Sequence, residues 1–200
     1  MLTFLGGTTV TGCDFTANDG TGMTITCGLP SPRSGAFTAN HGDGIANNSD
    51  NTAVTNCTFT ANTQGMTNLY ESCAAITHCT FTGNHDGGML NQSSHPTVID
   101  CAFTDNTASR GAGMSNFEGG DPTVINCTFI ANHAAGEGGG MCNDSYCEPT
   151  VINCTFIGNT AELGGGMCNL AEAGPTLANC TFASNSADIG AGMYLSLIHI

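Results

Sequence analysis

The stretch PTVINCTFIANHAAGEGGGMCN at residues 122–143 returns at residues 149–169 as PTVINCTFIGNTAELGGGMCN, one residue shorter. A phrase repeated at such a distance is the signature of a repeat architecture in which each copy is one structural unit. Less similar copies of the same motif recur along the rest of the chain. The unit is defined by a phenylalanine, an asparagine three residues later, and a glycine-rich turn that ends in methionine.

The phenylalanine occurs in eight copies, spaced by 22, 22, 22, 22, 26, 27 and 26 residues, at Phe15, Phe37, Phe59, Phe81, Phe103, Phe129, Phe156 and Phe182. The asparagine follows each of them, at Asn18, Asn40, Asn62, Asn84, Asn106, Asn132, Asn159 and Asn185. Asparagine tolerates left-handed backbone geometry, and its amide can bond to the amides above and below it. We therefore expect each asparagine to occupy a turn and the eight to form a ladder. We expect the eight phenylalanines to stack inside the core.

The repeat predicts strands rather than helices, because glycine triplets disfavour helices and the Thr and Val content favours strands. VINCTF at 124–129 alternates, which predicts Ile125, Cys127 and Phe129 on the inner face and Val124 on the outer face. One such unit cannot close a core, whereas stacked copies can pair in parallel about 4.8 Å apart. Parallel crossovers are overwhelmingly right-handed. We predict an all-β protein, a right-handed parallel β-helix (a single-stranded β-solenoid) of about eight coils of 22–27 residues.

Residues 1–195 are predicted to form one β-helix segment. From the phenylalanine to the methionine, the first four copies use 7–8 residues and the last four use 11–12. We therefore expect a longer corner in coils five to eight and a change of cross-section near residues 104–113. Residues 196–200 lie outside the repeat, and the ending LSLIHI is either translated sequencing-adapter read-through or the start of a ninth coil. Because MLTFLGGTTV lacks the features of a signal peptide, we expect a fragment of a larger protein.

The charge balance excludes some partners. Two Lys and Arg residues stand against sixteen Asp and Glu residues, a formal net charge of −14. Nucleic acids and anionic membranes need basic residues to neutralise phosphate, so neither is an expected partner. The sequence contains no run of 18 apolar residues, so we expect no membrane insertion of this segment.

The words FTAN, FTGN, FIAN and FIGN, paired with GGGM, GAGM and GGML, resemble the FxxN and GGA[ILV] repeats of chlamydial polymorphic outer membrane proteins. They are also similar to bacterial secreted right-handed parallel β-helix repeat proteins. The resemblance covers about residues 13–193, with Met at the fourth position of the glycine motif. It implies a secreted or outer membrane-associated, cell-surface bacterial protein with an adhesin role and a pectin lyase-like fold. The implied partner is a surface glycan or a host or neighbouring protein.

The sequence indicates a non-enzymatic structural or adhesin-like segment, with no catalytic residues and no cofactor. The alternative is a carbohydrate-binding or polysaccharide-degrading β-helix protein whose active parts lie on the loop edge or outside the segment. A lyase acting on acidic sugars needs cationic groups, and Arg33 and Arg110 stand three coils apart. A minor alternative is an ice-binding solenoid, for which the T-F-T words at 58–60 and 80–82 would supply a threonine array.

Two surface features are candidate sites. The loop after the methionine carries apolar residues among polar ones, a possible contact edge of Tyr70, Phe117, Tyr146 and Leu170. The corner after the asparagine carries acids, of which Glu137, Glu162 and Asp188 are expected to line up. Hard cations take carboxylate oxygens, so these three are a weak candidate Ca²⁺ edge; the other interpretation is a solubilising edge.

Seven of the twelve cysteines form one column, two residues before each phenylalanine except at Gly35. Such cysteines behave as small buried hydrophobes, and we expect free thiols there. Cys142 and Cys168 share another column with Cys147 nearby, and a disulfide or metal role for these three stays open. The N-C-T sequons at 56, 126, 153 and 179 are expected on strands rather than loops, which disfavours glycosylation.

Overall fold

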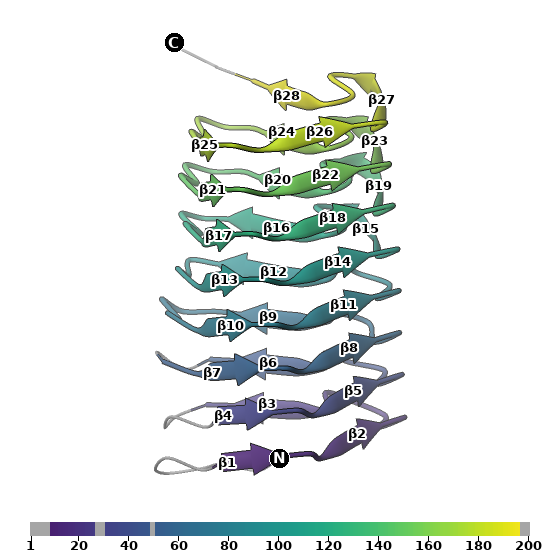
Figure 1. Ribbon diagram of the computed structural model, residues 1–200, viewed down its shortest axis with the longest axis vertical. Coiled ribbons are helices and arrows are strands. Elements are labelled where there is room, and N and C mark those ends of the chain that lie inside the picture. Colours follow the sequence, from purple (N-terminus) through teal and green to yellow (C-terminus); the bar gives the residue numbers. More distant parts are fainter. Residues whose placement is uncertain (1–8, 27–30, 49–50, 197–200) are drawn as a thin grey trace.

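The computed structural model describes residues 9–26, 31–48 and 51–196. Short strands stack coil upon coil into a rod, from the purple N-terminal end to the yellow C-terminal end (Figure 1). Three sheets of eight strands and one sheet of four strands run along the rod, and neighbouring strands pair in parallel. From the first to the last strand of each long sheet the chain makes about seven turns. The prediction of an all-β parallel solenoid is confirmed.

Each long sheet collects one strand from every coil. Sheet A contains β1 (Thr9–Thr11), β4 (Ser31–Arg33), β7 (Ala53–Thr55), β10 (Ala75–Thr77), β13 (Thr97–Ile99), β17 (Thr123–Ile125), β21 (Thr150–Ile152) and β25 (Thr176–Ala178). Sheet B contains β2 (Asp14–Thr16), β5 (Ala36–Thr38), β8 (Thr58–Thr60), β11 (Thr80–Thr82), β14 (Ala102–Thr104), β18 (Thr128–Ile130), β22 (Thr155–Ile157) and β26 (Thr181–Ala183). Sheet C contains β3 (Met23–Ile25), β6 (Ile45–Asn47), β9 (Met66–Asn68), β12 (Met89–Gln92), β16 (Met114–Phe117), β20 (Met141–Asn143), β24 (Met167–Asn169) and β28 (Met193–Leu195).

The fourth sheet begins where the spacing of the repeat lengthens. Sheet D contains β15 (Thr107–Arg110), β19 (His133–Glu137), β23 (Thr160–Leu163) and β27 (Ser186–Ile189), all from the last four coils (Figure 1). The residues added at this corner therefore form an extra strand in each long coil, and the rod widens from residue 107 onward. Of the tail predicted to lie outside the repeat, Ser196 still donates its backbone N–H to Asn169 at 2.9 Å. Residues 197–200 lie outside the described residues.

The eight phenylalanine rings form one stack inside the rod. Successive ring centroids are 4.6–5.0 Å apart and the ring planes differ by 3–7°. The six inner rings are fully buried, and Phe15 and Phe182 at the two ends are half-buried. This separation equals the rise per coil and lies in the range that stacked aromatic pairs prefer. The stack therefore fixes the register of every coil against the next.

The predicted asparagine ladder is present, and its amides bond to the backbone as well as to each other. Nδ2 of Asn62 donates to the carbonyl of Phe37 at 2.8 Å and to Oδ1 of Asn84 at 3.2 Å. Oδ1 of Asn62 accepts from Nδ2 of Asn40 at 2.8 Å and from its backbone N–H at 3.2 Å. The buried amide therefore uses both N–H donors and its oxygen acceptor in hydrogen bonds to the coils before and after it. All polar atoms of the side chain have partners.

One expectation about this ladder is wrong. The left-handed backbone belongs to the residue before each asparagine, such as Ala61 (φ 53°), Asp105 (φ 52°) and Ala131 (φ 53°). That residue turns the chain so that the asparagine side chain points inward, where the bonds described above hold it.

Sheet C carries a second buried ladder of asparagines, two residues after the position that is methionine in most copies. Nδ2 of each member donates to Oδ1 of the next at 2.7–3.1 Å, in the order Asn47, Asn68, Asn91, Asn116, Asn143 and Asn169. Two independent amide ladders therefore run along the core on either side of the phenylalanine stack.

The expected face assignment within VINCTF is also wrong. β17 ends at Ile125 and β18 begins at Thr128, and between them Asn126 adopts a left-handed φ of 55°. This corner breaks the alternation, so Val124 is fully buried with Cys127 and Phe129, whereas Ile125 is only half-buried. The two short strands belong to different sheets, and the period of two applies only within each.

Truncation of a central ring tests the stack. Phe103→Ala removes a fully buried side chain between two stacked neighbours, and we expect it to cost about 3–5 kcal/mol of unfolding free energy. Thr104→Ala, at the outward position next to it, is the matched control and should change stability by less than about 1 kcal/mol. Chemical denaturation followed by circular dichroism measures both. Equal effects of the two substitutions would contradict the role given to the stack.

A central amide tests the ladder. Asn106→Ala leaves the carbonyl of Phe81 without the Nδ2 donor that bonds it at 3.0 Å, and leaves Nδ2 of Asn84 without the acceptor that bonds it at 2.9 Å. Because buried groups without partners cost about 1–3 kcal/mol each, we expect a total loss of roughly 2–5 kcal/mol. Asn56→Gly, at an exposed left-handed corner that glycine adopts without strain, is the control for loss of an asparagine side chain as such. A thermal melt in which both variants unfold at the same temperature would refute this assignment.

Candidate functional site

The step at which sheet D begins forms a groove on the side of the rod. β15 is the first strand of the extra sheet, and the sheet continues from it only toward the C-terminal coils (Figure 1). The groove encloses about 340 Å³, and its walls include Asp86, Leu90, Arg110, Phe117, Glu118 and Asp144. These residues come from three successive coils, so the groove exists only because the coils differ in length.

Arg110 is the organising residue of this groove. Its Nε lies 2.8 Å from Oε2 of Glu137, and its Nη1 lies 3.2 Å from Oδ2 of Asp144. Arg110 ends β15 in register with Glu137 on β19, and Asp144 follows β20 on the other side of the groove. The guanidinium, half exposed, therefore ties the new sheet to sheet C across the groove.

The electrostatic balance of the groove favours neutral or cationic ligands. Three carboxylates, Asp86, Glu118 and Asp144, line it together with one guanidinium. Oε2 of Glu118 also accepts a hydrogen bond of 2.6 Å from Nε2 of Gln92. Phe117 contributes a half-buried aromatic wall. An aromatic face beside fixed polar groups suits a polar organic ligand without negative charge.

The predicted contact edge does not form one strip. Tyr70 and Tyr146 are 72% and 67% exposed, in turns of different coils. Phe117 lies in the groove described above, and Leu170 is half-buried beyond β24. The four residues occupy different positions within their turns because these loops differ in length and conformation. Only Phe117 belongs to a concave site.

The predicted alignment of three acids holds for Glu162 and Asp188, which stand in register on β23 and β27, and is wrong for Glu137. A register shift within the pairing of β19 and β23 places Glu137 opposite Leu163, and Glu137 is bound to Arg110. Glu162 and Asp188 are exposed on the following two coils. The shift arises because coil six carries one residue more than its neighbours at this corner. Among the residues that the structure describes, no three His, Cys, Asp or Glu side chains converge on a point that could hold a metal ion.

The three cysteines left open by the sequence fall into two separate places. Cys142 and Cys168 are register partners on β20 and β24 and are both buried. Cys147 donates its S–H to the carbonyl of Asp144 at 2.8 Å, and burial raises the pKa of its thiol to about 11. The described cysteines are free thiols in the structure.

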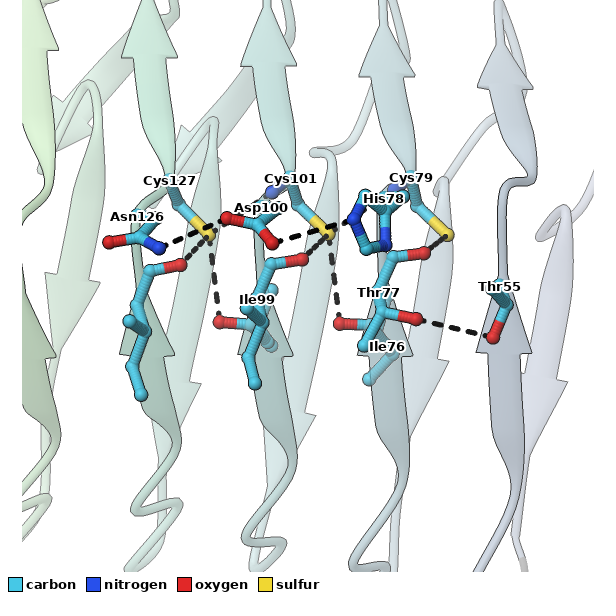
Figure 2. A network of polar contacts seen from close by, with 12 residues as sticks. Thr55, Ile76, Thr77, His78, Cys79, Ile99, Asp100, Cys101, Asn126 and Cys127 are labelled. Carbon is cyan, nitrogen blue, oxygen red and sulfur yellow. Dashed lines mark hydrogen bonds and ion pairs between the residues drawn. The ribbon is translucent and has the colours of Figure 1, made fainter.

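The corner between sheets A and B carries an outer ladder that sequence reasoning missed (Figure 2). His78 lies 3.5 Å from Asp100, and Nδ2 of Asn126 donates to Oδ1 of Asp100 at 3.1 Å. Asn153 and Asn179 continue the chain of contacts at 3.2 Å per step. Figure 2 shows His78, Asp100 and Asn126 of this ladder, each next to the cysteine that follows it in the chain. The sequence does contain a sign of this ladder, because each of its members directly precedes a cysteine of the inner column.

The sequons therefore lie elsewhere than expected. Their asparagines, Asn56, Asn126, Asn153 and Asn179, are exposed and adopt left-handed φ values of 53–55° at this corner, not within strands. The following cysteine turns inward and the threonine begins β8, β18, β22 or β26.

A carboxyl near the groove predicts a pH effect. Burial raises the pKa of Asp43, a hydrogen bond from Thr67 opposes the rise, and the negative charge of Asp86 adds to it. The folded state thus holds this proton more tightly than the unfolded chain. The stabilisation that comes from binding this proton to Asp43 is complete below the ordinary pKa of 3.8. It is lost as the pH rises through the raised pKa of the folded state.

We therefore expect Asp43→Asn to raise the melting temperature at pH 7, because the neutral amide avoids the cost of a buried charge. The gain should shrink as the pH falls toward 3.8. Asp14→Asn, at an exposed carboxyl, is the matched control for the removal of one negative charge. Melting temperatures measured across this pH range decide the matter, and a gain that is constant with pH would contradict the stated cause.

The sequence was compared with models of known protein families and with curated proteins. The model of the family described as "Right handed beta helix region" matches residues 35–182. No curated protein matches the chain. The described part of the chain has no helix that is long and apolar enough to cross a membrane. The match covers most of the coils whose stacking is described above, and the chain belongs to the right-handed β-helix family.

Proposed function

We propose that this chain is a non-enzymatic, rigid repeat segment of a secreted or cell-surface bacterial protein, where it serves as an adhesin-like stalk. The observation that carries the proposal is the unbroken core. Seven successive ring pairs and two amide ladders hold every coil to the next. Side chains committed to such ladders support stiffness and are unavailable for chemistry at the surface.

The surface is consistent with this role. Thr, Ser and Asn side chains dominate the outer faces of the strands, and the net charge of −14 opposes association between rods. The proposal includes the resemblance of the repeat motifs to those of the chlamydial polymorphic outer membrane proteins. It also includes the outer-membrane location that this resemblance implies. The exposed turns around Tyr70 and Tyr146 offer contact points for a protein or glycan partner.

The groove beside Arg110 favours a second candidate function, carbohydrate recognition. Phe117 supplies an aromatic surface, and carboxylates and hydroxyls supply hydrogen-bond acceptors and donors around it. Because the lining carries more negative than positive groups, a neutral or amino-substituted glycan fits better than a uronate polymer.

The location is tested on intact cells that make the protein. Antibodies against the purified chain should label the surface of unbroken cells or detect the chain in the medium. Labelling that appears only after the cells are lysed would rule out the stalk proposal.

Turnover and binding assays separate the two candidate functions. We expect the purified chain to release no new reducing ends from neutral or acidic polysaccharides. Binding to a glycan array that is lost in Phe117→Ala but kept in Tyr70→Ala would support recognition at the groove. Depolymerisation by the unmodified chain that disappears in Asp144→Asn would overturn the non-enzymatic proposal.

A further inference from the structure

Two cysteines form an isolated pair on the outer face of sheet C. Cys142 on β20 and Cys168 on β24 are direct register partners, and their column continues with Ser115 on one side and Tyr194 on the other. Although they point away from the core, they are only 1% and 0% exposed. This outward position distinguishes them from the thiol column that lies inside the rod.

The longer corner of the last four coils buries this pair. After β19 and β23 the chain turns back over sheet C through Gly138 and Gly164, whose φ values are 66° and 63°. A Cβ built on Gly138 would lie 2.7 Å from Cβ of Cys142, and one on Gly164 would lie 2.8 Å from Cα of Cys168. The glycine backbones thus pack directly on the two cysteines. The shorter coils lack this cover because they lack sheet D.

The groove gives the pair a route to solvent. Cys142 forms part of the wall of the groove, together with Arg110 and Asp144. The inner column of Cys57, Cys79, Cys101, Cys127 and Cys154 is 0–2% exposed, and the groove does not reach it. A small ion entering the groove therefore meets Cys142 before any thiol of the inner column, and Cys168 lies next to Cys142 in register.

The spacing of the pair selects the geometry of a bound ion. No third His, Cys, Asp or Glu among the described residues converges with it, so a tetrahedral zinc site is not built here. Two metal–thiolate bonds of about 2.3 Å placed end to end span ~4.6 Å. The rise per coil, measured by the stacked rings, is 4.6–5.0 Å. Sulfurs on register partners with the same side-chain conformation are separated by about one such rise, which is close to the span of a linear two-coordinate ion.

We propose that Cys142 and Cys168 form a two-thiolate binding site for a soft monovalent metal ion of the Cu(I) class, reached through the groove beside Arg110. Thiolate ligands select Cu(I) over harder ions. Binding changes no oxidation state: the ion forms two bonds to sulfur, and the two thiol protons pass to solvent. The resulting complex carries one negative charge, and Arg110, which also pairs with Glu137 and Asp144, is the positive group that shares the groove wall with Cys142.

The test uses the full chain with Cys13, Cys27 and Cys73 replaced by serine. Cys13 and Cys73 are exposed thiols that would bind copper on their own, and Cys27 lies outside the described residues. The protein is kept reduced by a phosphine without oxygen, and Cu(I) is supplied from a competing chelator. Native mass spectrometry counts the ions, and ultraviolet absorption reports the bond between copper and thiolate. We expect one ion per chain.

Variants of this background decide where the ion binds. Cys142→Ser and Cys168→Ser should each abolish the one-to-one complex, whereas Cys147→Ser, at a buried thiol outside the pair, should retain it. Arg110→Gln leaves both thiols in place and should weaken binding by about 10-fold through loss of the compensating charge. Unchanged binding in Cys142→Ser, or no binding under competition by the background protein, would overturn the proposal.

A second measurement does not depend on the folding of any serine variant. X-ray absorption by the copper-loaded background protein gives the number of sulfur neighbours of the ion. Two sulfurs at one distance support the linear site. Three or more sulfurs would place the ion elsewhere and refute the assignment.

Discussion

The buried asparagine amide is the interaction on which the rest of this structure depends. An amide inside a protein must satisfy both its donors and its acceptor or destabilise the fold by several kcal/mol. Asn84 and its equivalents meet this demand only if a neighbouring coil presents an identical amide in register. The ladder therefore permits little variation at the turn that contains it, and it imposes the same path on every coil.

This constraint explains where the chain was free to change. The two amide ladders and the phenylalanine stack fix three positions in each coil, so added residues have to appear between them. They appear at the corner between sheets B and C, where they pair with one another as sheet D. The first of these strands has no equivalent beneath it, so its Arg110 lines a groove with residues of the shorter coil before it while its guanidinium pairs with Glu137 and Asp144 of the coil after it. The groove and the cover over Cys142 follow from that one change in spacing.

The parts of the fold that could be predicted from sequence are those that repeat in every coil. The Phe and Asn columns recur at fixed distances, and their spacing alone gives the solenoid, its parallel pairing and the position of the widened corner. The faces around Asn126 could not be predicted by alternation, because a single left-handed residue divides one apparent strand into two. The same position holds the outer ladder, whose members vary between His, Asp and Asn.

The candidate site was harder to predict because it arises where the repeat is broken. Glu137 was expected beside Glu162, but one extra residue shifts it by a bulge onto Arg110. The sequence did contain a signal: Arg110 stands at a corner that is acidic in most copies, one coil before Glu137. A single basic residue at a corner that is otherwise acidic indicates an ion pair between coils. The number of residues between the two does not say which acid is the partner.

The vertical match between coils also has a consequence for how such a chain can change its size. Every coil makes its ring contact, its amide contacts and its strand pairings only with the coil above and the coil below. Deleting or duplicating one whole phrase, such as 122–143 with its linker, leaves equivalent partners on both sides of the junction. Gain or loss of one repeat unit would thus alter the length of the rod in steps of one coil, without any redesign of its core.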